Sequence, residues 1–243
     1  MTSRYDRIGL NYSELRKPDP RIAARIEAAL GESRTILNVG AGAGSYEPAG
    51  REVTALEPSV EMIRQRSTPA AAVVQGRAED LPFADRSFDG SMAVLTVHHW
   101  SDPAKGLGEM RRVTRGPVVI LTYDPSFRGF WLADYFPALV ALDEAQMPDM
   151  AEYERRLGPV AIAPVPIPND CSDGFLCAYW RRPAAYLDPR VRAAMSSFWA
   201  LGDLSEALAR LKEDLDSGAW AERYGDLLAL EALDCGYRLV VAD

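Results

Sequence analysis

A glycine-rich segment and a carboxylate 17 residues beyond Gly40 are the residues of this sequence best suited to bind a ligand. The segment 38–44, Asn-Val-Gly-Ala-Gly-Ala-Gly, follows an apolar run, and glycines let a backbone turn tightly and approach a ligand without Cβ interference. Glu57 stands where a second strand is expected to end, and a carboxylate there can accept both hydroxyls of a ribose. The dinucleotide fingerprint needs a third glycine where Ser45 stands, and the short turn that follows leaves little helix to hold a pyrophosphate. We therefore expect a nucleoside cofactor without phosphates.

The two histidines of the chain, His98 and His99, are adjacent and predict acid–base chemistry. They follow the expected fourth strand, and Asp124 follows the fifth. Ligands of open α/β sheets bind at the carboxyl ends of strands, so these residues lie where a site is expected. An imidazole can take a proton from a hydroxyl, and a carboxylate can orient the imidazole. The alternative is structural: the histidines fasten a loop, and Asp124 begins a turn.

Apolar segments alternate with amphipathic helices over the first half of the chain, which predicts the elements that position these residues. Strands are expected at 35–39, 52–56, 72–75, 88–95 and 117–123. Helices are expected to begin at Pro20 and Pro103, each after an aspartate N-cap. Continuous apolar strands separated by helices are typical of a doubly wound α/β fold, whose mainly parallel sheet is covered on both faces.

The pattern changes after residue 125. Residues 126–158 and 168–233 are expected to form a helical cap, and 159–167 and 236–242 two late strands that complete a seven-stranded sheet. Residues 31–125 would then be the ligand-binding core and residues 1–30 a lid of N-terminal helices, all within one domain. Aromatic residues gather where the cap should form a wall of the site, at positions 127, 130, 131, 135, 136, 175, 179, 180 and 186.

Composition narrows the classes of partner. The formal net charge of −8 disfavours nucleic acid and anionic membranes as partners, and no apolar run is long enough to span a bilayer. Three cysteines without a Cys-x-x-Cys pair and only two histidines predict neither a disulfide framework nor a metal site. The start of the chain lacks the apolar stretch of a signal peptide, so a cytoplasmic location is expected. The oligomeric state stays open.

Four ordered blocks resemble the class I S-adenosylmethionine-dependent methyltransferases, in particular the type 11 group. They are LNVGAGAG at 37–44, TALEPS at 54–59, AEDLPFADRSFD at 78–89 and HHWSD at 98–102, and the likeness covers about residues 1–125. Some sugar O-methyltransferases of natural-product pathways with this fold look similar around His98, His99 and Asp124. The resemblance implies a Rossmann-like fold and S-adenosylmethionine as cofactor.

The resemblance also implies roles for single residues. The loop residues Gly40, Ala41, Gly42 and Gly44 would pass under the methionine and ribose of the cofactor, and Glu57 would bind the ribose. The adenine and the methionine would meet the other expected contacts, which are Tyr12, Arg16, Pro58, Met62, Ala78, Glu79 and Leu95. The sequence departs from the family at Asn38, where relatives usually carry an acid, and at Arg77, where Asp or Asn is common.

The expected activity is methyl transfer to a small, partly apolar organic acceptor, with O-methylation assisted by a histidine base. Two alternatives stay open: C- or N-methylation that depends on proximity alone, and a protein that binds S-adenosylmethionine as a sensor or scaffold. A nicotinamide oxidoreductase is disfavoured by Ser45.

Overall fold

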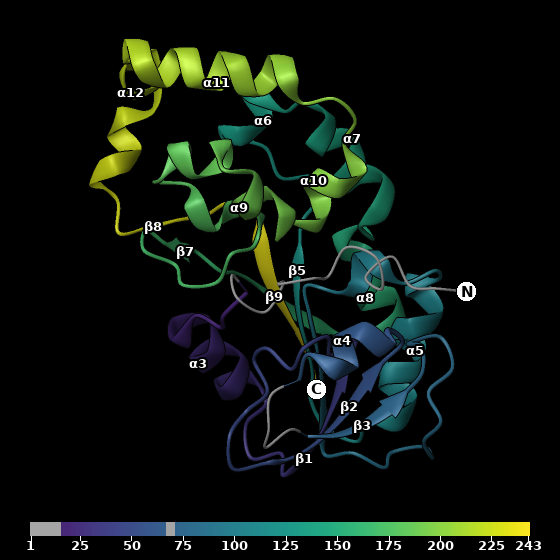
Figure 1. Cartoon of the computed structure of the whole chain (residues 1–243). Coiled ribbons are helices and arrows are strands. Elements are labelled where there is room, and N and C mark those ends of the chain that lie inside the picture. Colours follow the sequence, from purple (N-terminus) through teal and green to yellow (C-terminus); the bar gives the residue numbers. More distant parts are fainter. Residues whose placement is uncertain (1–15, 67–70) are drawn as a thin grey trace.

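A mainly parallel sheet of seven strands runs through the computed structural model, which describes residues 16–66 and 71–243 (Figure 1). The strand order is β3-β2-β1-β4-β5-β9-β6, and among these seven strands β9 alone runs opposite to the other six. The strands are β1 (Thr35–Val39), β2 (Glu52–Glu57), β3 (Ala72–Gln75), β4 (Gly90–Val94), β5 (Val118–Tyr123), β6 (Val160–Pro164) and β9 (Tyr237–Ala242). This confirms the doubly wound fold with a mainly parallel sheet of seven strands.

Side chains of the central strands alternate between two cores. Val119 and Leu121 of β5 face one core, and Val118 and Ile120 face the other. All four are at most 2% exposed, as expected for a parallel sheet that is covered on both faces. Because every strand from β1 to β5 runs the same way, the loops after β1, β2 and β4 emerge at one edge of the sheet.

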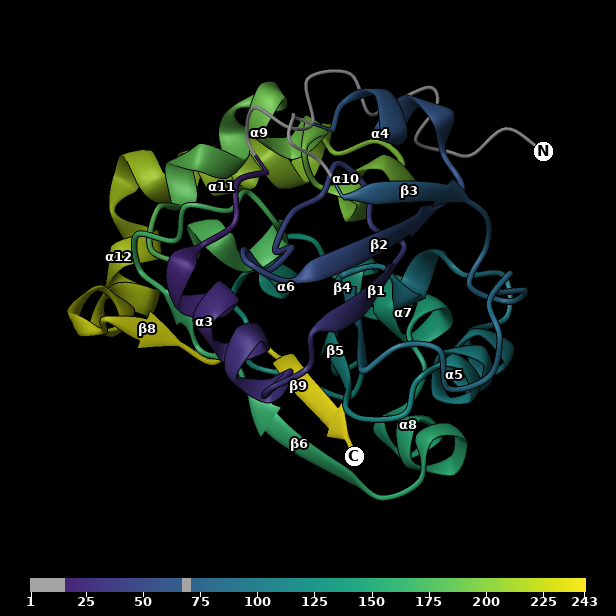
Figure 2. The same ribbon diagram turned by 90° about the horizontal axis from the view of Figure 1, so that it is seen from below.

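Helices cover both faces of the sheet (Figure 2). Helix α3 (Pro20–Ala29) lies on one side and buries Ile22 and Ile26. On the other side lie α5 (Pro103–Val113) and α8 (Met150–Leu157), while the short α4 (Val60–Arg64) follows β2. Two expectations were wrong here: α3 is a layer of the sheet rather than part of a lid, and α8 packs with α5 rather than in the cap.

The cap stands above the carboxyl edge of the sheet (Figure 1). Its α-helices are α6 (Leu132–Tyr135), α7 (Ala138–Gln146), α9 (Pro189–Ala193), α10 (Ser196–Ala200), α11 (Ser205–Ser217) and α12 (Ala219–Tyr224). Three 3₁₀ helices, η2 (Leu176–Tyr179), η3 (Pro183–Leu187) and η4 (Gly225–Ala229), and a small pair of strands, β7 (Ile167–Pro168) and β8 (Ala232–Leu233), complete it. None of the helices in the described part of the chain is long and apolar enough to cross a membrane.

Aromatic residues hold the cap together, and most of them do not form the expected wall of a pocket. Trp131 donates from its indole to the carbonyl of Trp180 (2.9 Å), whose own indole donates to the carbonyl of Ile167 (2.9 Å). Tyr186 is fully buried and donates to the carbonyl of Leu176 (2.7 Å). These side chains belong to the same core as one face of the sheet. Large aromatic side chains contribute more to stability when they are buried than when they line an open cavity.

Candidate functional site

A cavity of about 650 Å³ opens where β1, β2 and β4 end. It brings together most of the residues that the sequence singled out: Arg16, Gly40, Ala41, Gly42, Glu57, Pro58, Met62, Ala78, Glu79, Leu95, His98 and His99. Tyr12 lies outside the described residues. Gly44 and Asp124 do not line this cavity.

The glycine loop takes a backbone conformation that side chains disfavour. Gly40 and Gly42 have φ angles of +69° and +52°. The amides of Gly40 and Ala41 both donate to the carbonyl of Leu56 (2.9 and 3.0 Å), which ties the loop to the end of β2. A Cβ on Gly40 would lie 2.2 Å from Oγ1 of Thr96, so the loop closes against the segment after β4. These constraints bring backbone, rather than side chains, to the cavity wall.

Glu57 is fixed by two backbone donors. The amide of Gly42 donates to its Oε2 and the amide of Ser59 to its Oε1, both at 2.8 Å. The residue is only 6% exposed and lines the cavity. One carboxylate therefore holds the glycine loop in place and presents a negative charge to whatever fills the cavity.

The opposite wall comes from the segment after β3 and from the entry to α5. Oε1 of Glu79 accepts from the amides of Ser101 (2.6 Å) and Asp102 (3.2 Å). Burial raises the pKa of Glu79, but these bonds and one from the Ser101 hydroxyl outweigh it, so the net pKa is lowered. The ring of Trp100 also lines the cavity and packs against Gly106 of α5, where a Cβ would lie 2.5 Å from the ring.

Gly44, an expected site residue, and Asn38, which also lines the cavity, contact a network of framework residues. A Cβ on Gly44 would lie 3.3 Å from the guanidinium of Arg66, which forms an ion pair with Glu47 (2.7 Å). Asn38 donates to the same Glu47 carboxylate (3.1 Å), so the residue that replaces the family's acid belongs to this network.

Asp124 was expected to orient a histidine, and the structure contradicts this. Its Oδ1 accepts from the amide (2.9 Å) and the hydroxyl (2.6 Å) of Ser126, and its Oδ2 lies 3.8 Å from Nε of Arg238. The carboxylate thus closes the turn after β5, which is the structural alternative that an Asp-Pro pair at a strand end favours.

Arg16 joins the site to the cap. Its Nε donates to Oδ1 of Asp173 at 2.6 Å, and Tyr46 donates from its hydroxyl to Oδ2 of the same carboxylate (2.9 Å). Burial, followed by the charge of Asp173, raises the pKa of Tyr46, which stays protonated. Arg16 also lines the cavity, so a contact with the methionine part of the cofactor would share this guanidinium with Asp173.

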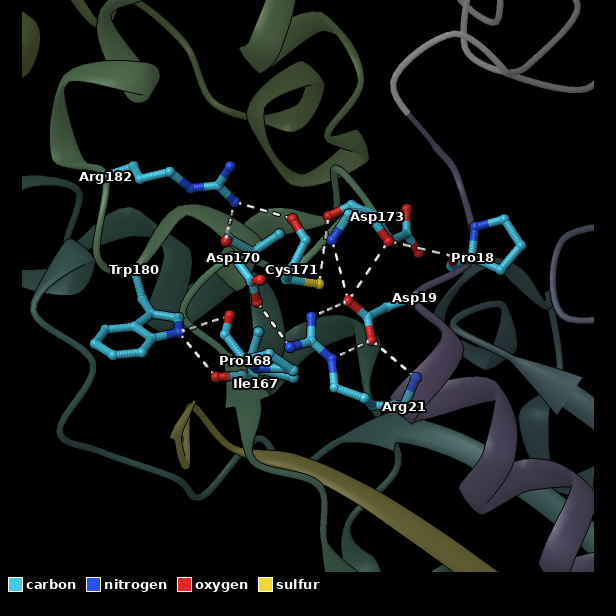
Figure 3. A network of polar contacts seen from close by, with 12 residues as sticks. Pro18, Asp19, Arg21, Ile167, Pro168, Asp170, Cys171, Asp173, Trp180 and Arg182 are labelled. Atoms are coloured by element: carbon cyan, nitrogen blue, oxygen red, sulfur yellow. Dashed lines mark hydrogen bonds and ion pairs between the residues drawn. The ribbon is translucent and has the colours of Figure 1, made fainter. Parts of the chain in front are cut away.

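A second set of bonds extends this connection through Asp19 (Figure 3). Asp19 accepts from the side chain of Arg21 (2.7 Å) and from the amide of Ser172 (3.1 Å). Burial raises the pKa of Asp19, but these bonds outweigh it and lower the pKa to about 2. The segment before α3 is therefore fastened to residues 170–173 of the cap by charges on both sides.

The histidines differ in their surroundings. Their rings lie 3.8 Å apart, with His99 exposed and His98 partly buried. Burial, together with the charge of Arg16, lowers the pKa of His98 to about 4, so this imidazole is neutral at neutral pH. The neutral ring can accept a hydrogen bond there, but it takes up a second proton poorly.

A second cavity of about 50 Å³ shares Arg16, Leu95 and His98 with the first. Leu95 has a φ of +50°. This left-handed conformation costs a residue that carries a Cβ roughly 1–2 kcal/mol. Other parts of the second cavity's wall come from β5, β9 and the cap, and include Tyr123, Asp143, Phe175, Ser196 and Tyr237. Because the two cavities have three wall residues in common, ligands in them would be neighbours.

Comparison with known proteins identifies the family. Residues 37–120 match a family model described as a methyltransferase domain. A candidate methyltransferase from an antibiotic biosynthesis pathway of Anabaena variabilis is 36% identical, over 94% of this chain and 99% of that one, with a TM-score of 0.87. The chain belongs to the class I S-adenosylmethionine-dependent methyltransferases.

Curated relatives match over a shorter stretch. Demethylmenaquinone methyltransferase of Renibacterium salmoninarum is 36% identical over 104 residues, which is 39% of this chain and 44% of that protein. Malonyl-[acyl-carrier protein] O-methyltransferase of Pseudescherichia vulneris is 39% identical over 104 residues, 39% of this chain and 41% of that protein. The chain thus aligns with less than half the length of either relative. Geranyl diphosphate C-methyltransferase of Streptomyces coelicolor, 16% identical with a TM-score of 0.52 over 92% of this chain and 78% of that one, shares the fold.

The cavity fits the family's methyl donor. S-adenosylmethionine needs a carboxylate for its ribose, an apolar slot for adenine and a close backbone for its methionine part. Glu57 would supply the first, and Pro58, Met62 and Ala78, which line the same cavity, would supply the second. The backbone of Gly40, Ala41 and Gly42 in the cavity wall would supply the third.

Several wall residues escaped the sequence interpretation. Thr96 and Trp100 lie beside motif residues, and proximity to the His-His pair was the signal that could have found them. Gln146 and Asp143 stand on α7, far along the chain, and their sequence neighbourhood carries no motif. Their position depends on how the cap packs.

Proposed function

We propose that this protein transfers the methyl group of S-adenosylmethionine to the hydroxyl oxygen of a small, partly apolar organic molecule. The observation that carries the proposal is the common wall of the two cavities, formed by Arg16, Leu95 and His98. A donor in the larger cavity and an acceptor group in the smaller one meet at this wall. Holding two reactants in contact accounts for a large part of such a rate enhancement.

The character of the smaller cavity supports a partly apolar acceptor. Phe175, Tyr237 and Met195 give it apolar surface, and Ser196 and Ser197 give it hydroxyls. A volume of about 50 Å³ takes a reacting group with a carbon or two, so the cavity selects the reacting end of the acceptor. The curated relatives named above act on a demethylmenaquinone and on a malonyl group, which agrees with small reacting groups.

His98 is the histidine that fits a role at the reacting hydroxyl. The sulfonium of bound S-adenosylmethionine supplies a strongly electrophilic methyl. The neutral imidazole of His98 lies in the common wall and can accept a hydrogen bond from the acceptor's O–H. His99 is exposed and lines the larger cavity only. We further propose a cytoplasmic, small-molecule role without nucleic acid, which the net charge of −8 favours.

Methyl transfer from tritiated S-adenosylmethionine tests the proposal. Purified protein is offered a panel of small phenols, enols, hydroxy acids and amines, and the labelled products are identified by mass spectrometry. We expect label on a hydroxyl oxygen. Label on carbon or nitrogen would favour transfer by proximity alone. Tight binding of adenosylhomocysteine with no transfer to any acceptor would favour the sensor or scaffold.

A further inference from the structure

One face of α7 reaches both cavities. Gln146 lines the larger cavity, and Asp143, together with Met147 directly after the helix, lines the smaller one. Residues three and four apart lie on the same side of a helix, which explains how one short stretch serves both walls. Asp143 thereby brings a carboxylate to the acceptor side of the common wall.

The Asp143 carboxylate has no hydrogen bond or ion pair with any residue in 16–66 or 71–243. The nearby cations are engaged elsewhere: Arg128 forms an ion pair with Glu144, and Arg16 with Asp173. A partly buried carboxylate without a partner carries a desolvation cost, and its position in a cavity wall points to a ligand that carries a donor hydrogen.

The other ionisable groups near Asp143 do not compensate for its burial. His98, Tyr123 and Tyr237 share its cavity, and burial keeps both tyrosines protonated by raising their pKa values. Burial raises the pKa of Asp143 to about 7, against a smaller lowering by Arg128. A general base is most effective when its pKa lies near the working pH.

We propose, on the basis of the function proposed above, that Asp143 is the group that removes the proton from the acceptor hydroxyl. The acceptor oxygen forms its bond to the methyl carbon while the carbon–sulfur bond breaks and its electron pair stays on sulfur. The hydroxyl proton passes to the Asp143 carboxylate, which later releases it to water. His98 orients the same hydroxyl as a neutral imidazole and gains no proton.

Charge balance favours the carboxylate over the imidazole. Transfer to Asp143 neutralises the sulfonium and the carboxylate together, so no charge is left in a poorly solvated site. Transfer to His98 would leave an imidazolium where burial and Arg16 disfavour it. This difference, rather than proximity, separates the two candidate bases.

Rates against pH test the proposal once the acceptor panel has given a methylated hydroxyl. We expect wild type to show a rising limb with an apparent pKa close to 7. Asp143→Asn should lose that limb and about 10²–10⁴-fold in turnover, the usual range for a lost general base. His98→Gln should keep the limb with a smaller loss. The control is Glu213→Gln, an exposed carboxylate on α11, which should match wild type. Full rate and an unchanged profile in Asp143→Asn would overturn the proposal.

A second readout is independent of turnover. The side-chain carboxyl carbons of aspartate are labelled with ¹³C, and the adenosylhomocysteine-loaded protein is titrated by NMR, with Asp143→Asn to assign the signal. Phenol and anisole are matched probes that differ in the donor hydrogen. We expect the Asp143 signal to titrate near pH 7 and to shift with phenol but not with anisole. A signal that titrates near pH 4 and ignores both probes would refute the role of Asp143. Failure of the function itself would instead appear as absent adenosylhomocysteine binding or absent methyl transfer.

Discussion

Glu57 shows how one side chain can be structural and functional at once. Its carboxylate accepts two amide hydrogens at 2.8 Å, one of them from the glycine loop, and it lines the larger cavity. A substitution here therefore changes the shape of the loop as well as the contact that we propose with the ribose of the cofactor. The two effects separate only when an isosteric variant is compared with a truncated one.

We expect Glu57→Ala to weaken adenosylhomocysteine binding at least tenfold, because charge-assisted hydrogen bonds contribute roughly 1.5–3 kcal/mol each. Glu57→Gln keeps the size of the side chain and should lose less. Calorimetry measures both affinities, and a melting curve shows whether the loop still folds. Unchanged affinity in a folded Glu57→Ala would mean that the ligand lies elsewhere.

Gly40 offers a test of close approach as distinct from backbone strain. Gly40→Ala adds a Cβ at 2.2 Å from Thr96 in a left-handed conformation, whereas Gly50 has a similar φ of +75° and nothing within 4 Å of a Cβ. We expect Gly50→Ala to lower stability by about 1 kcal/mol, the strain alone. Gly40→Ala should lose more stability than Gly50→Ala, and it should also bind adenosylhomocysteine more weakly. Chemical denaturation and calorimetry compare the pair, and equal losses would contradict a steric role for Gly40.

At the scale of elements, the sequence predicted the helix starts and the strands, because neighbouring residues decide both. Asp19 and Asp102 do cap α3 and α5, since each side chain accepts an amide hydrogen of the first turn. The strands could be predicted because an unbroken apolar run is typical of a strand in a sheet that is covered on both faces. The placement of α3 in a lid, the aromatic wall and the role of Asp124 were wrong, because each depends on what packs against the element. Nothing in the residues of α3 says whether its apolar face meets a sheet or a ligand.

Helix α5 carries a matched pair of glycines that links an element to the site. A Cβ on Gly106 would lie 2.5 Å from the Trp100 ring and 3.1 Å from Cβ of Ala78, two residues of the cavity wall, while Gly108 has nothing within 4 Å. We expect Gly108→Ala to stabilise the protein by roughly 0.5–1 kcal/mol through helix propensity. Gly106→Ala should displace Trp100 and weaken adenosylhomocysteine binding several-fold. Calorimetry on both variants decides, and equal affinities would show that Trp100 does not shape the cavity.

At the scale of the molecule, one apolar core extends from the face of the sheet that α3 covers into the cap. Ile36 of β1 and Trp220 of α12 belong to it, and the ion pairs Arg16–Asp173 and Arg21–Asp170 fasten the same two parts. A core that crosses this boundary joins the sheet and the cap into one cooperative unit. The sequence could not show this, because the contacts join distant parts of the chain, such as Arg16 and Asp173, which are 157 positions apart.

His98 and Asp143, two titrating groups of the smaller cavity, act on stability with opposite signs. The pKa of His98 falls from 6.5 to about 4 on folding, so its contribution to stability is lost as pH drops from about 6.5 to 4. The pKa of Asp143 rises from 3.8 to about 7, so its contribution is lost as pH climbs from about 4 to 7. In wild type the two dependences oppose each other over most of this range.

We expect single variants to reveal these dependences. Relative to wild type, the melting temperature of His98→Gln should fall as pH rises from 4 to 7, because the Asp143 dependence is no longer opposed. That of Asp143→Asn should fall as pH drops over the same range. Melting curves at half-unit steps of pH measure both differences. Difference curves that are flat with pH would show that neither group titrates abnormally.

The wall of Arg16, Leu95 and His98 also imposes a thermodynamic symmetry on the two ligands. If occupancy of one cavity changes this wall, each ligand must alter the affinity of the other by the same factor, because the coupling free energy is reciprocal. Adenosylhomocysteine, the product of the cofactor, can therefore be used to detect acceptor candidates. Some compounds will raise the affinity for adenosylhomocysteine in wild type but not in a variant with an altered wall. Such a compound binds in the second cavity, and this is detected before any turnover is seen.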